Sequence, residues 1–181
     1  KKHVRISKNT INSYIEYLID AFVVEKAQRY DIKGRRYIDT PFKYYFTDIG
    51  LRNAQIGFRQ IEETHIMENV LYNELRSRGF SVDVGVVNTA EVNAQGKRQK
   101  KQLEVDFVCN RASRRYYIQS AYALPDAEKT EQEQKSLLKI GDSFKKVIIS
   151  KDAPGPWYTE EGVLVTNLFD FLLDRDSLEK L

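Results

Sequence analysis

The 181-residue sequence is poor in the residue types that build disulfides and zinc sites. It has a single cysteine, Cys109, and two histidines, His3 and His65. One cysteine cannot form an internal disulfide or a cysteine-rich zinc site. Cys109 lies within an apolar strand pattern, so we expect it in the core. The two histidines are isolated in the sequence, and we interpret each as a surface or packing residue rather than a ligand.

Long apolar runs are also absent. No stretch approaches the roughly 20 residues needed to span a bilayer, and the first five residues lack the apolar segment of a signal peptide. The sequence therefore predicts a cytoplasmic location and no membrane partner. Hydrophobic residues make up 41% and charged residues 30%, which indicates a folded globular protein rather than a disordered or fibrous one.

The positive charge is small in total but gathered in patches. The net charge of +3 permits a nucleic-acid partner without requiring one. Basic residues concentrate near the start of the chain and again between Lys97 and Lys101. Because closely spaced like charges repel, we predict an exposed, flexible loop over Asn93 to Lys101. The alternative is a solvated loop that binds nothing.

The first third of the chain reads as a helix followed by a hairpin. Apolar residues at helical spacing predict a helix over Thr10 to Ile19, capped by Asn9 or Thr10. The segment 31–34 has the composition of a hairpin turn, with Arg35 to Ile38 as the return strand and a further strand over 43–46. Helix then hairpin is the second half of a winged helix, so we predict a winged-helix-like segment and joint over residues 1–58, with its incoming helices before residue 1.

The rest of the chain, residues 59–181, has the order α, β, β, β, α, β. Its strongest helix is predicted over Thr64 to Arg78 and ends at Gly79. The predicted strands are Phe80–Val87, Leu103–Cys109, Arg115–Tyr122 and Lys146–Ser150, and a capping box of Thr130 and Glu133 starts a helix before the last of them. We therefore predict an α/β (α+β) protein, in which a winged-helix remnant precedes a restriction-endonuclease-like αβββαβ core.

Acidic residues on the helix and the second strand suggest a vestigial nuclease site. Glu74 lies near the middle of the helix's apolar face, Glu68 lies at its edge, and Asp106 lies within the strand. A carboxylate on an apolar face is costly unless it is paired, protonated or bound to metal, so Glu74 and Asp106 are the predicted metal ligands. A buried polar pair or a surface ion pair is the alternative, and the sequence does not decide whether Glu68 or Glu74 faces the site.

The third strand departs from what phosphodiester hydrolysis needs. Gln119 stands where a second acid should be, and Ala121 stands where a lysine should orient the attacking water. We therefore expect no active catalytic residues, only a vestigial site of Glu68, Glu74, Asp106 and Gln119. We predict no cofactor beyond weak Mg²⁺ binding.

Several stretches resemble the domain of unknown function DUF4143, which follows the ATPase module in prokaryotic AAA-type ATPases. They are Asn9–Ile11, Tyr14–Leu18, Lys43–Asn53, Glu68–Leu75, Glu104–Val108 and Tyr117–Gln119. The resemblance implies an upstream ATPase domain and other copies of it as partners. This chain has no glycine-rich phosphate loop, so ATP would bind only to that upstream domain.

The leading functional hypothesis is a non-catalytic nucleic-acid-binding or regulatory module of such an ATPase, with duplex DNA as the partner. The expected phosphate contacts are basic residues of the hairpin and the basic loop: Lys8, Lys33, Arg35, Arg36, Lys97, Arg98, Lys100 and Lys101. The alternatives are a protein-interaction or oligomerisation module and a residual metal-dependent nuclease that uses Glu74, Asp106 and Gln119.

Overall fold

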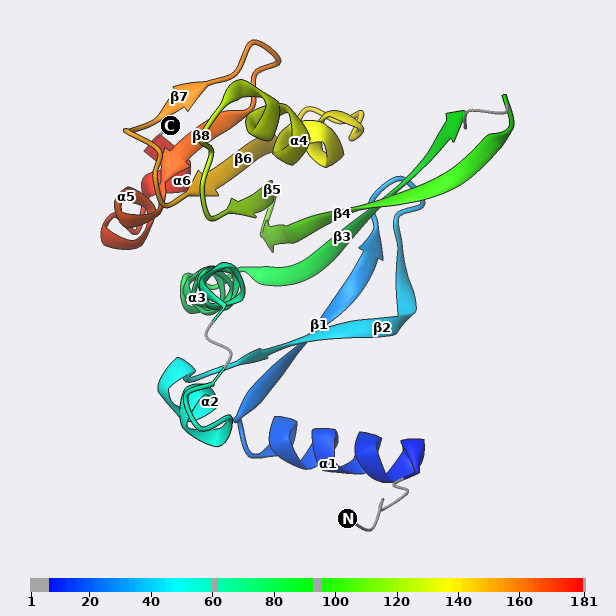
Figure 1. Cartoon of the computed structure of the whole chain (residues 1–181), viewed down its shortest axis with the longest axis vertical. Coiled ribbons are helices and arrows are strands. Elements are labelled where there is room, and N and C mark those ends of the chain that lie inside the picture. Colours follow the sequence, from blue (N-terminus) through cyan, green and yellow to red (C-terminus); the bar gives the residue numbers. More distant parts are fainter. Residues whose placement is uncertain (1–6, 60–61, 93–95, 181) are drawn as a thin grey trace.

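The computed structural model describes residues 7–59, 62–92 and 96–180, which form six helices and one eight-stranded sheet (Figure 1). The α+β class is therefore confirmed. The elements are α1 (Lys8–Asp20), β1 (Val24–Asp31), β2 (Arg36–Phe46), α2 (Ile49–Gln55), α3 (Glu63–Ser77), β3 (Ser81–Val92), β4 (Arg98–Arg111), β5 (Arg114–Ala121), α4 (Ala127–Leu138), β6 (Lys145–Ser150), β7 (Trp157–Tyr158), β8 (Leu164–Asn167), α5 (Leu168–Leu173) and α6 (Ser177–Lys180).

The strands follow the order β2-β1-β3-β4-β5-β6-β8-β7 across the sheet. β3, β4 and β5 are antiparallel neighbours, whereas β5, β6 and β8 are parallel. A parallel step needs a crossover, and α4 provides the one between β5 and β6. The run from α3 to β6 has the predicted order α, β, β, β, α, β. The β1–β2 hairpin joins the same sheet through β3, so the sheet continues across the boundary predicted at residues 58 and 59.

Two apolar clusters fill the two faces of the sheet. On one face, Leu71 and Tyr72 of α3 pack with Phe107 of β4 and Phe171 of α5. Cys109 belongs to this cluster and is fully buried, as predicted. On the other face, the buried residues include Leu137 of α4 together with Tyr117, Ile148 and Val165. Because helices cover both faces, the central strands are apolar throughout rather than alternating.

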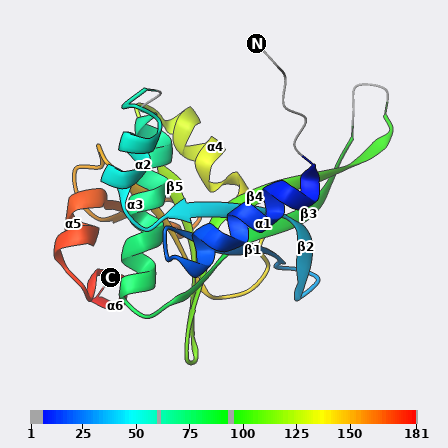
Figure 2. The same cartoon turned by 90° about the horizontal axis from the view of Figure 1, so that it is seen from below.

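The last four residues of the predicted basic loop, 98–101, are instead part of a β-hairpin. β3 and β4 continue their pairing as far as Val92 and Arg98, and they form an arm that projects from the body of the molecule (Figures 1 and 2). Arg98, Lys100 and Lys101 therefore lie on a strand. Residues 93–95 of the predicted loop lie outside the described residues.

Other predicted boundaries also change. β2 is one continuous strand where two short ones were predicted, and it pairs with β1 on both sides of an irregularity between Ala27 and Arg29. Ser7, rather than Asn9 or Thr10, caps α1. Asp126 caps α4 by accepting a hydrogen bond from the Lys129 backbone at 2.7 Å, so that helix begins before Thr130. Each of these caps supplies an oxygen to a backbone N–H that would otherwise lack a partner.

The β1–β2 hairpin bends away from β3 and returns over α3. β1 pairs with β3 only through Arg29, Tyr30 and Asp31. Asn69 of α3 then holds the end of β2, because its side chain accepts from the Phe46 N–H at 2.9 Å and donates to the Phe46 carbonyl at 2.8 Å. In these two hydrogen bonds the Asn69 amide pairs with the Phe46 N–H and carbonyl as the backbone of a neighbouring strand would. They bring the second half of β2 beside α3 and so position the residues described next.

Candidate functional site

The acidic residues of α3 and β4 meet around one lysine from β2. The Lys43 Nζ lies 2.6 Å from Glu104 Oε1, 2.9 Å from Glu68 Oε1 and 4.0 Å from Asp106 Oδ1. Arg29 of β1 contacts the second oxygen of Glu104 at 2.7 Å. We call Lys43, Glu68, Glu104 and Asp106 the Lys43 cluster. It places three carboxylates from two elements around one ammonium group.

Burial and charge shift the titration of this cluster. Burial, and then the negative charge of Glu68, raises the pKa of Asp106 to about 7, although its Oδ2 accepts a hydrogen bond from the Ser120 N–H at 2.8 Å. Burial lowers the pKa of Lys43, but the attraction of Glu68 and the hydrogen bonds to Glu104 and Glu68 outweigh it, so the net shift is upward. Lys43 therefore stays charged.

Tyr45 holds Glu68 through its hydroxyl. The hydroxyl donates to Glu68 Oε1 at 2.6 Å, and the Tyr45 ring stacks on Tyr72 with 4.1 Å between centroids. Burial, followed by the charge of Glu68, raises the pKa of the Tyr45 hydroxyl above its ordinary value. Tyr45 is thus a neutral donor in the core, whereas Tyr44 is exposed and lines a small pocket beside Lys43 and Glu68.

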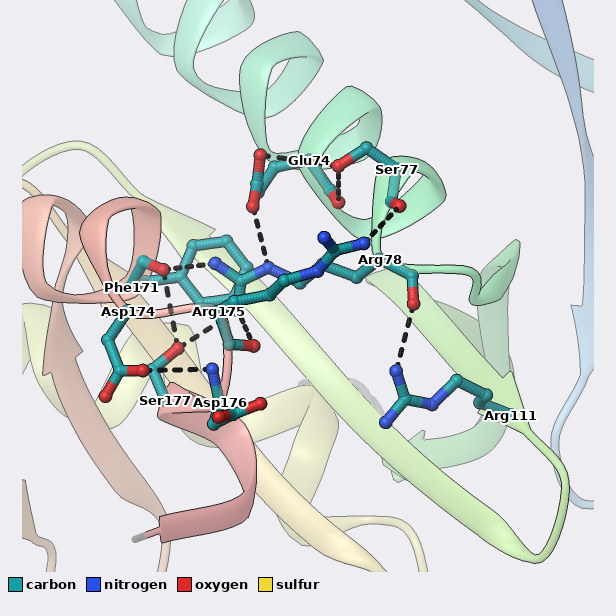
Figure 3. Close-up of polar contacts among 9 residues, drawn as sticks. All are labelled: Glu74, Ser77, Arg78, Arg111, Phe171, Asp174, Arg175, Asp176 and Ser177. Atoms are coloured by element: carbon teal, nitrogen blue, oxygen red, sulfur yellow. Dashed lines mark hydrogen bonds and ion pairs between the residues drawn. The ribbon is translucent and has the colours of Figure 1, made fainter.

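Glu74 belongs to a different cluster, which forms around Arg78 at the C-terminal end of α3 (Figure 3). Its Oε1 accepts from Arg78 Nε at 2.8 Å, and Arg78 also donates to the carbonyls of Phe171 and Arg175 and to the Ser177 hydroxyl. The Arg78 side chain is only 2% exposed, and its guanidinium lies over the Phe171 ring. Asp106 has Glu68, Lys43 and Glu104 as its charged neighbours. This corrects the predicted metal pair, because Glu68 and not Glu74 is the helix carboxylate beside Asp106.

The residues present do not fit the Mg²⁺ ion that a nuclease-like site implies. Gln119 is beside Asp106, with its Oε1 3.5 Å from the Asp106 backbone N, but it brings no charge. Ala121 is buried in the apolar cluster under α4 and offers no group to orient water. Mg²⁺ requires oxygen ligands at about 2.0–2.1 Å in octahedral geometry. Here the carboxylate oxygens instead contact the ammonium of Lys43.

The structure brings together three of the predicted nucleic-acid-binding residues. Lys33 and Arg36, from the turn and start of β2, line one open groove with Lys100 of β4. Asn88, Thr89 and Gln102 contribute polar groups to the same groove. Asp31 is also present, but its oxygens accept from the Gly34 N–H at 2.9 Å and the Asn88 amide at 3.1 Å. We call this surface the basic groove.

The other predicted basic residues lie elsewhere or have acidic partners. Lys101 pairs with Glu91 at 2.9 Å. Arg35 lines a separate pocket together with Arg114 and Arg115. Lys8 is exposed on α1, and Lys97 and Arg98 are exposed at the outer part of the arm. His65 pairs with Glu62 at the surface, and His3 lies outside the described residues.

Sequence reasoning missed Lys43, Glu104 and Arg29 as members of the acidic cluster. A signal for Lys43 was available, because strand alternation puts it on the same face as Tyr45, whose ring is buried. A lysine on a buried face needs an acidic partner. No pattern within the sequence identifies that partner, because Glu68 and Glu104 come from elements packed together only in the folded chain.

The fold is thus a mixed sheet that carries the Lys43 cluster and, separately, the basic groove. A family model described as "Domain of unknown function (DUF8612)" matches residues 1–62. This is a different domain of unknown function from the DUF4143 domain that the motifs resemble, and the match provides no link to an AAA-type ATPase. No solved structure gives a significant match.

Two curated proteins are similar over most of this chain. An uncharacterized protein of Haemophilus influenzae is 33% identical over 175 residues, which cover 95% of this chain and 39% of that protein. An uncharacterized protein of Methanocaldococcus jannaschii is 28% identical over 156 residues, which cover 83% of this chain and 32% of that protein. The chain therefore spans 32% to 39% of the length of these relatives.

None of the helices described over residues 7–59, 62–92 and 96–180 is long and apolar enough to cross a membrane.

Proposed function

We propose that this chain is a non-catalytic nucleic-acid-binding module within a longer protein. The observation that carries the proposal is the basic groove. Lys33 and Arg36 are more than sixty residues from Lys100 in the sequence, yet all three line one surface. Cationic side chains gathered in this way neutralise phosphates, and the released counter-ions supply most of the affinity in sequence-independent binding.

The shape of this region supports a nucleic-acid ligand over a small one. The groove is open, and part of its lining comes from β3 and β4, the two strands that extend into the arm projecting from the body (Figure 1). Side chains on one face of β4 alternate with those on the other, so Arg98 and Lys100 share a face. A row of cations along an extended strand suits the repeating phosphates of a nucleic-acid backbone. The neutral Asn88 and Gln102 add donors and acceptors for phosphate or base contacts.

The Lys43 cluster supports the non-catalytic part of the proposal. Phosphodiester hydrolysis of this type uses an acidic metal ligand at position 119 and a lysine at position 121, whereas Gln119 is neutral and Ala121 is apolar. A residual metal-dependent nuclease therefore has less support than a binding module. Its test is DNA cleavage with Mg²⁺ or Mn²⁺ in wild type and in Asp106→Ala.

We also propose that the longer protein contains an ATPase domain. The relatives extend well beyond the matched region, which leaves room for another domain. The resemblance of Lys43–Asn53 and Glu68–Leu75 to the domain that follows AAA-type ATPase modules suggests that this domain is an ATPase. On that reading, the module would bind duplex DNA while ATP binds and turns over elsewhere in the protein.

A second candidate, a protein-interaction module, has one observation in its favour. The apolar side chains of α1 are unusually exposed, with Ile11 48%, Tyr14 63% and Leu18 42% accessible to solvent. Apolar residues gathered on an exposed helix often mark a protein interface. Light scattering over a range of concentrations tests this candidate, because self-association would raise the measured mass and Leu18→Glu would reverse the rise.

The test of the leading proposal is fluorescence anisotropy of a labelled DNA duplex at low salt. Wild type is compared with the groove variant Lys33→Gln/Arg36→Gln/Lys100→Gln. The control variant Lys129→Gln/Lys139→Gln/Lys180→Gln removes the same three charges from α4, its C-terminal cap and α6. We expect the groove variant to bind much more weakly and the control to bind nearly as well as wild type. Equal losses in both variants would contradict the proposal.

A further inference from the structure

Lys43 occupies the centre of the acidic cluster although it comes from outside the αβββαβ unit. The unit contributes Glu68 from α3 and Glu104 and Asp106 from β4. The ammonium reaches them from β2, and its 2.6 Å and 2.9 Å contacts to Glu104 and Glu68 are short, charge-assisted hydrogen bonds. The positive charge that a metal would bring to these carboxylates is therefore already present.

The end of the strand that carries Lys43 is bonded to α3. Asn69 bonds to both the N–H and the carbonyl of Phe46, and Asn73 donates to the same carbonyl at 2.9 Å. Tyr45 contacts the same Glu68 oxygen as Lys43. The strand that carries the lysine is thus fixed to the helix that carries the carboxylate, and this keeps the Lys43 ammonium within reach of Glu68.

We propose that Lys43 is a built-in counter-ion that takes the place of a divalent metal and closes the nuclease-like site to Mg²⁺ and Mn²⁺. A dication that entered would meet the ammonium at close range, and it would have to displace a lysine that makes two short hydrogen bonds. The site keeps its carboxylates but needs no metal to balance them. This inference is independent of nucleic-acid binding, because the basic groove shares none of these residues.

The first test is a titration of Mn²⁺ into the wild-type protein, in which the electron paramagnetic resonance signal of free Mn²⁺ reports how much metal stays unbound. We expect no Mn²⁺ site in wild type that depends on Asp106, so wild type and Asp106→Asn should give the same curve. A wild-type site that disappears in Asp106→Asn would overturn the proposal. This experiment needs no change at Lys43, so it can overturn the proposal even if Lys43 variants do not fold.

The second test removes the ammonium. Lys43→Ala leaves three carboxylates without their shared cation, and we expect it to gain a Mn²⁺ site together with a Mn²⁺-dependent rise in melting temperature. The double variant Lys43→Ala/Asp106→Asn should lose both gains. Lys43→Arg keeps the positive charge and should behave like wild type, as should the surface control Lys139→Ala. A folded Lys43→Ala that binds Mn²⁺ no better than wild type would overturn the proposal.

Discussion

Helix α3 carries two carboxylates that each pair with a cation, and the surroundings of the two cations differ. Lys43 binds Glu68 and Arg78 binds Glu74, and these acids are six residues apart, which places them about 120° apart around α3. Arg78 is buried, and its guanidinium donates to one carboxylate, two carbonyls and a hydroxyl. The Lys43 side chain is 27% exposed and serves three carboxylates.

The difference separates a buried structural ion pair from a partly exposed cluster in which carboxylates are in excess. Around Arg78 every acceptor belongs to α3 or to the segment 171–177, so the group ties the C-terminal helices to α3. Around Lys43 the acids outnumber the nearby bases, with three carboxylates against Lys43 and Arg29. An excess of carboxylates in a partly buried place is what our proposal of a lysine in place of a metal ion would require. The first cluster should therefore govern stability and the second should govern pH dependence.

The largest effect is expected from Arg78→Ala. Removal of the guanidinium leaves Glu74 and the carbonyls of Phe171 and Arg175 without their buried partner, which should cost about 3–5 kcal/mol in the free energy of unfolding. Urea denaturation measures this loss. The matched control is Arg76→Ala on the same helix, because Arg76 is 42% exposed and its ion pair with Glu25 should contribute at most about 1 kcal/mol. Similar losses in both variants would contradict the assignment of Arg78 as the structural cation.

The next effect concerns Asp106 and has a defined sign. Its pKa is about 7 in the folded protein against an ordinary value of 3.8, so the folded state holds the proton more tightly. Stability should therefore fall as pH rises from about 4 to about 7. Asp106→Asn removes this titration, so the variant should be more stable than wild type at pH 8. We expect a difference on the order of 3 kcal/mol, because each pKa unit corresponds to about 1.4 kcal/mol and the amide keeps only part of the hydrogen bonding. Urea unfolding of both proteins at pH 5 and pH 8 measures this difference in stability. If the free energy of unfolding changed with pH in the same way for wild type and Asp106→Asn, the prediction would be refuted.

The smallest effect is expected at Tyr45. Tyr45→Phe keeps the ring stacked on Tyr72 but removes the hydroxyl that donates to Glu68. Lys43 still bonds the same oxygen, so the loss should be about 1 kcal/mol by thermal or chemical unfolding. A loss as large as that of Arg78→Ala would mean that the Lys43 cluster, too, is mainly a structural anchor.

The parts of the fold that the sequence predicted well are those with strong periodicity. α3 was predicted within one residue at each end, because its apolar stripe is clear and Gly79 ends it with a positive φ of 85°. The central strands are short apolar runs with flanking turns, and their order was predicted from the same signals. Local sequence patterns are sufficient to predict an element when one of its faces packs against the core.

The β3–β4 arm could not be predicted in this way. Its outer residues, from Arg98 to Gln102, are exposed on both faces of the hairpin, so no alternation of apolar and polar residues marks them as a strand. Their cross-strand hydrogen bonds depend on the register set further down by buried residues such as Val87 and Val105. Repulsion between neighbouring lysines suggested a loop, but the backbone ladder holds the strand in place.

The candidate site was predicted only in part. Asp106 and Glu68 were identified from the sequence, but the choice between Glu68 and Glu74 depends on how α3 sits against the sheet. Lys43 completes the cluster because the Asn69 bonds to Phe46 hold the second half of β2 beside α3. Such tertiary contacts leave no pattern in a single sequence.

The most direct test of the nucleic-acid proposal is the salt dependence of duplex binding by wild type and by the groove variant Lys33→Gln/Arg36→Gln/Lys100→Gln. For wild type, the logarithm of the binding constant should fall linearly with the logarithm of salt concentration. The slope should be smaller in magnitude for the variant by up to about 2.7, because each phosphate that a removed cation no longer neutralises accounts for roughly 0.9. Identical slopes, or no binding by wild type at the lowest salt, would contradict the account and shift the function toward protein interaction through α1.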